Sequence, residues 1–267
     1  MTDDAALDEL RFLTRALRAH LEWQVDTGAT GLERAVREAA PAAASVSLLP
    51  PTAPVAPLPP TAPVEPRAAA PSNREPGDGR RLEVLAELAR ACTRCGLCKQ
   101  RKQAVFSRGT GSSGVCFVGE GPGADEDAQG LPFVGKAGQL LDRMIEAMGL
   151  TRDEVYVCNV VKCRPPENRK PEPEEVAACL PFLTEQLELI APRVIVALGA
   201  TAVEGLFGSA EGITRMRGNW KSYRGQIDVM PTFHPAYLLR NPAAKREVWA
   251  DLQEVLRRIG RSVPARR

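Results

Sequence analysis

Short apolar segments alternate with helical segments from about residue 81 onward, and this alternation limits the fold more than any other feature of the chain. Strands are expected at 115–118, 155–161, 194–198 and 227–233. Helices are expected at 82–91, 136–148, 174–190 and 245–259. Strands that alternate with helices of this length form parallel sheets. The sequence therefore predicts an α/β fold: a three-layer α/β/α sandwich with a central, mainly parallel four-stranded sheet.

Composition divides the chain into three parts. Residues 1–40 carry leucines at helical spacing, which predict an amphipathic helix that needs a partner surface: Leu10, Leu13, Leu17 and Leu21. Residues 41–80 are rich in Pro and Ala, and Pro-Pro-Thr-Ala-Pro-Val occurs at 50–55 and again at 59–64. Such a segment is typical of a disordered linker, and a docking site for a proline-binding module is the alternative. Residues 81–260 are expected to form the folded domain.

Charge and hydropathy say little about the partner of this domain. No run of about 18 apolar residues occurs, and the N-terminus lacks the basic-then-apolar order of a secretory signal, so a cytoplasmic location is expected. The formal net charge of +2 is too small to indicate nucleic-acid binding. Basic residues nevertheless cluster, either as a nucleic-acid surface or as a solvated one: 99–102, Lys162, Arg164, Arg169, Lys170 and 215–217.

The seven cysteines suggest a metal site. In a cytosolic chain, cysteines are more often metal ligands or core residues than disulfides. Cys92 and Cys95 form a C-x2-C pair that Cys98 extends, and Cys163 and Cys179 follow later. Two early and two later thiolates could hold either zinc or a 4Fe–4S cluster. The remaining two, Cys116 and Cys158, lie within apolar strands and are expected to be core residues.

Four positions near strand ends carry polar or aromatic groups suited to a ligand site. The turn at 119–123, Gly-Glu-Gly-Pro-Gly, follows a strand and allows close approach of the backbone. Asn159 lies near the end of the next strand, Phe133 lies on a loop, and His234 follows the last strand. Open α/β sheets bind ligands at the carboxyl ends of their strands, so the site is expected there. Simple packing roles for Phe133 and His234 are the alternatives.

Together these motifs resemble the family 4 uracil-DNA glycosylases, the iron–sulfur branch of that superfamily, over about residues 82 to 258. The resemblance rests on four segments in the family's order: 119–123, Leu-Pro-Phe-Val-Gly-Lys-Ala-Gly at 131–138, Asn-Val-Val-Lys-Cys-Arg-Pro-Pro at 159–166, and His-Pro-Ala-Tyr-Leu-Leu at 234–239. It implies a 4Fe–4S cluster bound by four cysteines and not by Cys98: Cys92, Cys95, Cys163 and Cys179. Residues 1 to about 80 have no counterpart in the family pattern.

The resemblance also implies roles for the site residues. His234 would donate to uracil O2, Asn159 would bind the Watson–Crick edge of uracil, and Phe133 would stack on the flipped base. Leu238 would be the wedge that fills the vacated position in the base stack.

The resemblance says less about which residue activates the water and which residues contact the DNA phosphates. Gly121 stands in the substrate-binding turn where family 1 enzymes carry an aspartate, so another carboxylate must orient the water. Glu120 is the first candidate, and Glu126 is the second, with a role in the pocket wall or a solvated surface position as its alternatives. Lys162 and Arg164 are candidate contacts to DNA phosphates.

The function predicted on these grounds is base excision repair. The protein would be a monofunctional glycosylase that flips uracil out of DNA and hydrolyses its N-glycosidic bond, leaving an abasic site. We expect a monomer that binds uracil-containing DNA, with a protein partner for the N-terminal helix. The alternatives are a covalent or a non-catalytic uracil-DNA-binding iron–sulfur protein and, less favoured, a small electron carrier. The covalent branch uses a histidine in an inserted basic loop, and the loop after Cys163 contains none.

Overall fold

The computed structural model describes residues 78–208 and 211–264. The predicted N-terminal helix at 1–40 and nearly all of the predicted linker at 41–80 lie outside these residues. No helix in the described part combines the length and the apolar character needed to cross a membrane.

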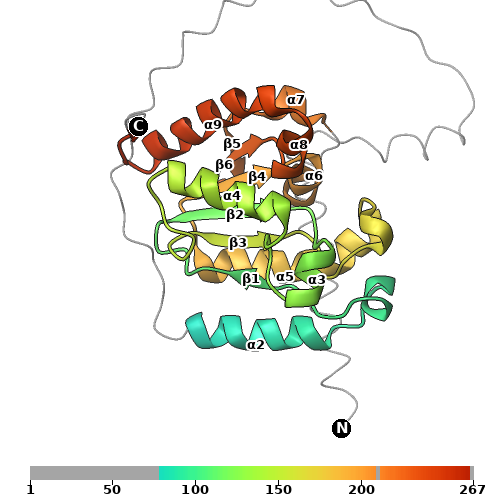
Figure 1. Cartoon of the computed structure of the whole chain (residues 1–267). Helices are drawn as coiled ribbons and strands as arrows, with labels where there is room; N and C mark the ends of the chain where they lie inside the picture. The colour runs from blue at the N-terminus through green and yellow to red at the C-terminus, as the bar shows by residue number, and fades with distance from the viewer. Residues whose placement is uncertain (1–77, 209–210, 265–267) are drawn as a thin grey trace, which may run out of the picture. The chain divides into compact units, whose positions relative to one another are not determined.

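The sheet has six strands in the order β1-β3-β2-β4-β6-β5 (Figure 1). The four central strands run parallel: β3 (Tyr156–Asn159), β2 (Val115–Gly119), β4 (Val194–Leu198) and β6 (Ile227–Thr232). They confirm the predicted parallel four-stranded core. Two antiparallel edge strands complete the sheet, β1 (Ser107–Arg108) on β3 and β5 (Lys221–Tyr223) on β6. These edges were not predicted, since two or three residues are too short to show an alternating pattern.

Helices cover both faces of the sheet, as the three-layer prediction requires (Figure 1). One face packs on α2 (Asp78–Ala91), α5 (Pro173–Ile190) and α6 (Ala200–Phe207). The other face packs on α4 (Lys136–Ala147), α8 (Pro235–Arg240) and α9 (Lys245–Arg258). The remaining elements are short: η1 (Gly96–Lys99), α3 (Ala124–Gln129), η2 (Pro166–Asn168), α7 (Ile213–Met216) and η3 (Pro242–Ala244).

Strands β2, β3 and β4 are buried along their whole length and β6 is buried over its last four residues, which explains their largely apolar sequences. In β2, Cys116 and Val118 face the core with α5, whereas Val115 and Phe117 face the core with α4 and α9. Cys158 packs beside Cys116 in the first of these cores, so both cysteines are core residues, as predicted. The polar residues near the strand ends are thereby left at one edge of the sheet.

Candidate active site

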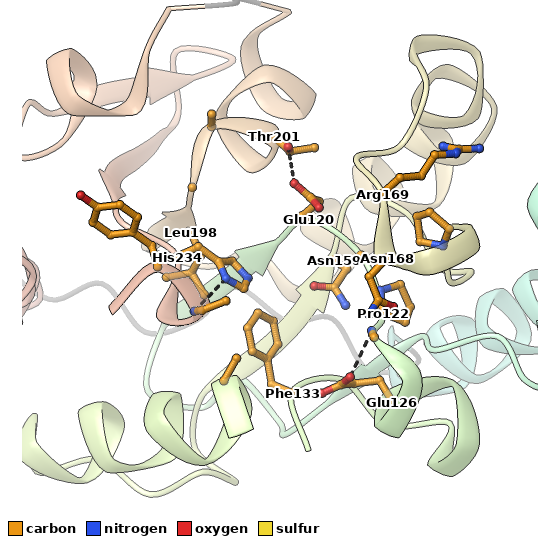
Figure 2. Close-up of a pocket in the computed structure, with 18 of the residues that line it drawn as sticks. Glu120, Pro122, Glu126, Phe133, Asn159, Asn168, Arg169, Leu198, Thr201 and His234 are labelled. Carbon is orange, nitrogen blue, oxygen red and sulfur yellow. Dashed lines mark hydrogen bonds between the residues drawn. The ribbon is translucent and has the colours of Figure 1, made fainter. Parts of the chain in front are cut away.

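A cavity of about 540 Å³ opens at the carboxyl ends of the four parallel strands. Its walls come from the segments that follow β2, β3, β4 and β6, together with the loop before α4 (Figure 2). This is the edge at which open α/β sheets bind ligands. The structure brings six predicted site residues together around the cavity: Glu120, Gly121, Glu126, Phe133, Asn159 and His234.

Asn159 is the last residue of β3 and is only 1% exposed. Its Oδ1 atom is buried and has no hydrogen-bond partner. An unpaired buried acceptor costs about 1–3 kcal/mol, so natural folds seldom keep one without a use. In this wall of the cavity, the free acceptor is suited to a ligand that donates a hydrogen bond.

Phe133 is held in the cavity wall by bonds to its neighbours. Arg108 Nε donates to the Pro132 carbonyl at 3.1 Å, and Glu126 Oε1 accepts from the amides of Val134 and Gly135, each at 2.9 Å. The backbone of Phe133 has φ 56°, a left-handed conformation that is rare for an aromatic residue. Strain of this kind persists where surrounding contacts determine the loop and is common at functional sites.

Two glycines make room for this arrangement. A Cβ atom on Gly119 would lie 2.5 Å from both Asn159 Oδ1 and Phe133 Cζ. A Cβ atom on Gly138 would lie 2.0 Å from the carbonyl oxygen of Phe133. Side chains at either position would therefore displace the amide or the ring.

His234 lies at the start of α8 and acts as its N-cap. Its Nδ1 accepts from the amide of Ala236 at 3.1 Å, which leaves Nε2 as the protonated nitrogen of a neutral ring. Burial, with a smaller contribution from the positive charge of Arg240, lowers the pKa of His234 to about 4. The ring centroid is 5.6 Å from that of Phe133. At neutral pH, His234 is thus an uncharged hydrogen-bond donor beside the aromatic wall.

The carboxylates of Glu120 and Glu126 differ in their hydrogen-bond partners. Glu120 Oε2 accepts from Thr201 Oγ1 at 2.5 Å, so a side chain after β4 orients this carboxylate at the cavity (Figure 2). Glu126 instead uses both oxygens on backbone amides, since Oε2 also accepts from Gly123 at 3.1 Å. Glu126 therefore shapes the cavity wall, and Glu120 is the carboxylate suited to orient water.

Two predicted DNA contacts are contradicted by burial. Leu238 is 1% exposed and packs into the core beneath α8, so it cannot enter a base stack. Lys162 is also 1% exposed, and its Nζ donates to the Asn159 carbonyl, so it cannot reach a phosphate from the surface. Leu239 and Tyr237 are the exposed apolar side chains of α8, at 44% and 38%.

Arg164 is partly exposed, and its Nε donates to Asn168 Oδ1 at 2.8 Å. It remains available to a ligand at the surface.

A second cavity, between α2, the end of β3 and α5, is lined by thiols: Cys92, Cys95, Cys98, Cys163 and Cys179. Burial raises the pKa of Cys179 to about 11 and also raises that of Cys163. Within residues 78–208 and 211–264, no group of three or more His, Cys, Asp or Glu side chains is placed to hold a metal ion.

Cations line the thiol cavity as well. Arg101 donates from Nη1 to Cys163 Sγ at 3.0 Å, Arg94 lies 5.2 Å over the Phe182 ring, and Lys162 also lines the cavity. No carboxylate is among the residues that line this cavity in the described part of the chain. The cavity therefore offers the thiols of the protein as ligands, and the surroundings of these thiols are positively charged.

Comparison with known proteins identifies the family. The sequence model of the uracil DNA glycosylase superfamily matches residues 106–253, more than half of the chain. The chain belongs to this superfamily. A Type-4 uracil-DNA glycosylase of Thermotoga maritima is 48% identical over 176 residues, which are 65% of this chain and 92% of the relative. Type-4 uracil-DNA glycosylases of Pyrobaculum aerophilum and Saccharolobus solfataricus are 47% and 43% identical and are covered over 91% and 84% of their lengths. The resemblance to family 4 is confirmed.

Several residues that line the cavity of this uracil-DNA glycosylase superfamily member were not predicted as site residues: Asn168, Thr201, Tyr237 and Arg240. Arg169, which also lines it, was expected only as part of a basic cluster. Thr201 follows Gly199, whose φ of 88° turns the chain from β4 into α6 and delivers the threonine to the cavity. A glycine directly after a predicted strand was the available signal, because ligands of open α/β sheets contact such turns.

Proposed function

We propose that this protein removes uracil from DNA by hydrolysing the N-glycosidic bond, which leaves an abasic site for base excision repair. The observation that carries the proposal is the unpaired Asn159 Oδ1 in a cavity that also holds a neutral histidine and an aromatic ring. The names of the relatives, Type-4 uracil-DNA glycosylases, support the same activity.

Asn159 selects the base. The Watson–Crick edge of uracil presents N3–H as a donor and O4 as an acceptor, whereas cytosine presents an acceptor at N3 and an exocyclic amine. The free Oδ1 of Asn159 fits the N3–H of uracil, and the amide nitrogen can donate to O4. Cytosine in the same pose would place its N3 acceptor against Oδ1, which leaves a buried acceptor unpaired and rejects the base.

Phe133 and His234 act on the rest of the base. The ring of Phe133 provides a surface for stacking of the flipped uracil. His234 Nε2–H donates to O2, on which negative charge develops as the glycosidic bond breaks. Because the pKa of His234 is about 4, the ring is neutral at pH 7, and the Nε2–H of a neutral imidazole is too weak an acid to transfer its proton to the base.

Glu120 orients the attacking water. Departure of uracil leaves an oxocarbenium-like sugar, which a carboxylate stabilises while it accepts a hydrogen bond from the water. The bond from Thr201 fixes one oxygen of Glu120 and leaves the other for the water.

The thiol cavity holds a 4Fe–4S cluster, bound by Cys92, Cys95, Cys163 and Cys179. The resemblance to family 4, the iron–sulfur branch, favours a cluster over a single zinc ion at these thiols. A cluster spreads its ligands over four irons, and four thiolates make it anionic, which agrees with the cations of the wall. When bound, the cluster supplies a covalent connection between the segment after α2, the end of β3 and α5.

DNA engages the rim of the active-site cavity. Leu239 and Tyr237 replace Leu238 as candidates for the side chain that enters the base stack, since both are exposed on α8 and Tyr237 lines the cavity. Arg164 and Arg240 are positioned at the surface for phosphates.

The deciding experiment incubates the protein with uracil-containing oligonucleotides and with matched oligonucleotides that contain thymine, followed by alkali to cleave abasic sites. Cleavage of the uracil strand alone supports the proposal. Tight binding of uracil-DNA without cleavage would instead indicate a non-catalytic binder, and a protein–DNA adduct that survives denaturation would indicate the covalent alternative.

A further inference from the structure

Lys162 is a buried cation without a carboxylate partner. Its side chain is 1% exposed and is among the largest fully buried side chains of the described residues. Nζ donates to the Asn159 carbonyl at 2.6 Å and lies 5.9 Å from the centre of the Phe106 ring. None of the ion pairs in the described part of the chain includes Lys162. Burial of an unpaired ammonium costs several kcal/mol, a cost that a nearby anionic group would offset.

The thiol cavity supplies that group. Lys162 lines the cavity, directly precedes Cys163, and donates from its backbone amide to Cys179 Sγ at 3.2 Å. A metal cluster with four thiolate ligands is anionic, and attraction to it would hold the lysine side chain inside the protein. An anionic cluster in the thiol cavity therefore explains why a cation is buried at this position.

The other side of Lys162 leads to the active site. Its ammonium bonds to the main chain of Asn159, the residue whose side chain lines the active-site cavity. The backbone carbonyl of Lys162 is in turn held by the Val105 amide at 2.7 Å. The backbone of Lys162 is thus held by the Val105 amide, and the ammonium at the end of its side chain holds the carbonyl of Asn159.

We propose that Lys162 is a positioning residue that couples the thiol-bound cluster to the base-reading amide of Asn159. The proposal rests on the excision activity proposed above. The anionic cluster holds the ammonium, and the ammonium holds the Asn159 backbone in the orientation that points Oδ1 into the cavity. Lys162 itself does not touch the base.

The test is Lys162→Met, which keeps the length of the side chain and removes its charge and donor. Single-turnover excision of uracil should fall roughly ten- to a hundredfold, because a small displacement of a positioned group has effects of this size. The dissociation constant for uracil-containing DNA should change little. Lys221→Met, on the exposed edge strand β5, is the control and should keep the wild-type rate.

A double-mutant cycle separates positioning from general stability. If Lys162 acts through Asn159, Lys162→Met should have almost no further effect in an Asn159→Ala background. If Lys162→Met instead caused a general structural defect, it would reduce the excision rate by the same factor in the wild-type and Asn159→Ala backgrounds. Additive losses, or a wild-type rate in Lys162→Met with its iron intact, overturn the proposal.

A readout without DNA tests the link to the cluster. Removal of a nearby cation should lower the reduction potential, because the reduced cluster carries one more negative charge. The ratio of reduced to oxidised cluster at a given potential should fall about tenfold, equivalent to about 59 mV for one electron. An unchanged potential overturns the coupling to the cluster whether or not the protein excises uracil.

Lys162→Gln is the second variant, since glutamine can still donate to the Asn159 carbonyl without a charge. If the methionine variant loses iron, the same cycle and potential are measured with glutamine. Loss of iron from both variants would mean that the lysine only stabilises the cluster, and the positioning role would be rejected.

Discussion

The two nitrogens of His234 have separate tasks, and two substitutions should separate them. Nδ1 caps α8 through the Ala236 amide, whereas Nε2–H is free to donate into the cavity. Asparagine is a preferred N-cap residue, and its Oδ1 can accept from Ala236 as Nδ1 does. His234→Asn therefore removes the donor and keeps the cap, whereas His234→Ala removes both.

The expected magnitudes follow from these two bonds. Loss of one preorganised donor to a developing negative charge costs about 2.7–4 kcal/mol, or about 10²–10³ in rate, so both variants should show this loss. Loss of the cap costs about 1 kcal/mol of stability, equivalent to about 2–4 °C in Tm for a domain of this size. Only His234→Ala should show that second effect.

The assay is single-turnover excision at saturating enzyme, with binding measured on an oligonucleotide whose uracil cannot be cleaved. Both variants should bind as the wild type does. A wild-type excision rate in His234→Asn would refute the assignment of Nε2 as the donor, and an equal Tm in the two variants would refute the capping role.

Four further predictions follow from burial, charge and the proposed cluster ligands. Because the pKa of His234 lies at about 4 in the fold against 6.5 for the free side chain, its neutral form contributes stability that is complete above pH 6.5 and is lost as the pH falls towards 4. Thermal unfolding of the wild type should therefore depend on pH more steeply in this range than that of His234→Asn. Leu238→Ala should lose about 2–5 kcal/mol of stability in denaturant unfolding. Leu239→Ala should change stability by less than about 0.5 kcal/mol while slowing excision from duplex DNA, and a duplex rate equal to that of the wild type would remove it as the wedge. Cys163→Ala should lose iron, visible absorbance and much of its stability, whereas Cys98→Ala should keep its iron, and the opposite pattern in iron analysis would change the ligand set.

The central sheet and the cavity could be predicted from the sequence because both depend on local patterns. Four apolar strands between helices fix the parallel core, and the parallel direction places the ends of all four strands at one edge. Asn159, Phe133 and His234 were expected at that edge, and they line its cavity.

The errors concern the direction in which side chains point. Leu238 lies four residues after His234 in the motif, but the rotation of α8 against α4 and α9 turns Leu238 into the core and Leu239 outward. Lysine is usually exposed, and the burial of Lys162 between the Asn159 carbonyl, the Phe106 ring and the thiol cavity depends on contacts between separate segments of the chain. The spacing of residues along the chain predicts neither the rotation of a helix against its neighbours nor a contact between distant segments.

Helix α8 has six residues, and its length has a mechanical consequence. His234 caps its first turn, and Tyr237 and Leu239 stand on the same short segment of about 9 Å. A single hydrogen-bonded unit of this size moves as a rigid body, so a push on the exposed side chains is transmitted directly to the imidazole. In the proposed function, the side chain that enters the DNA and the donor that contacts the base therefore belong to one rigid element, and the hydrogen bonds of α8 fix the distance between them.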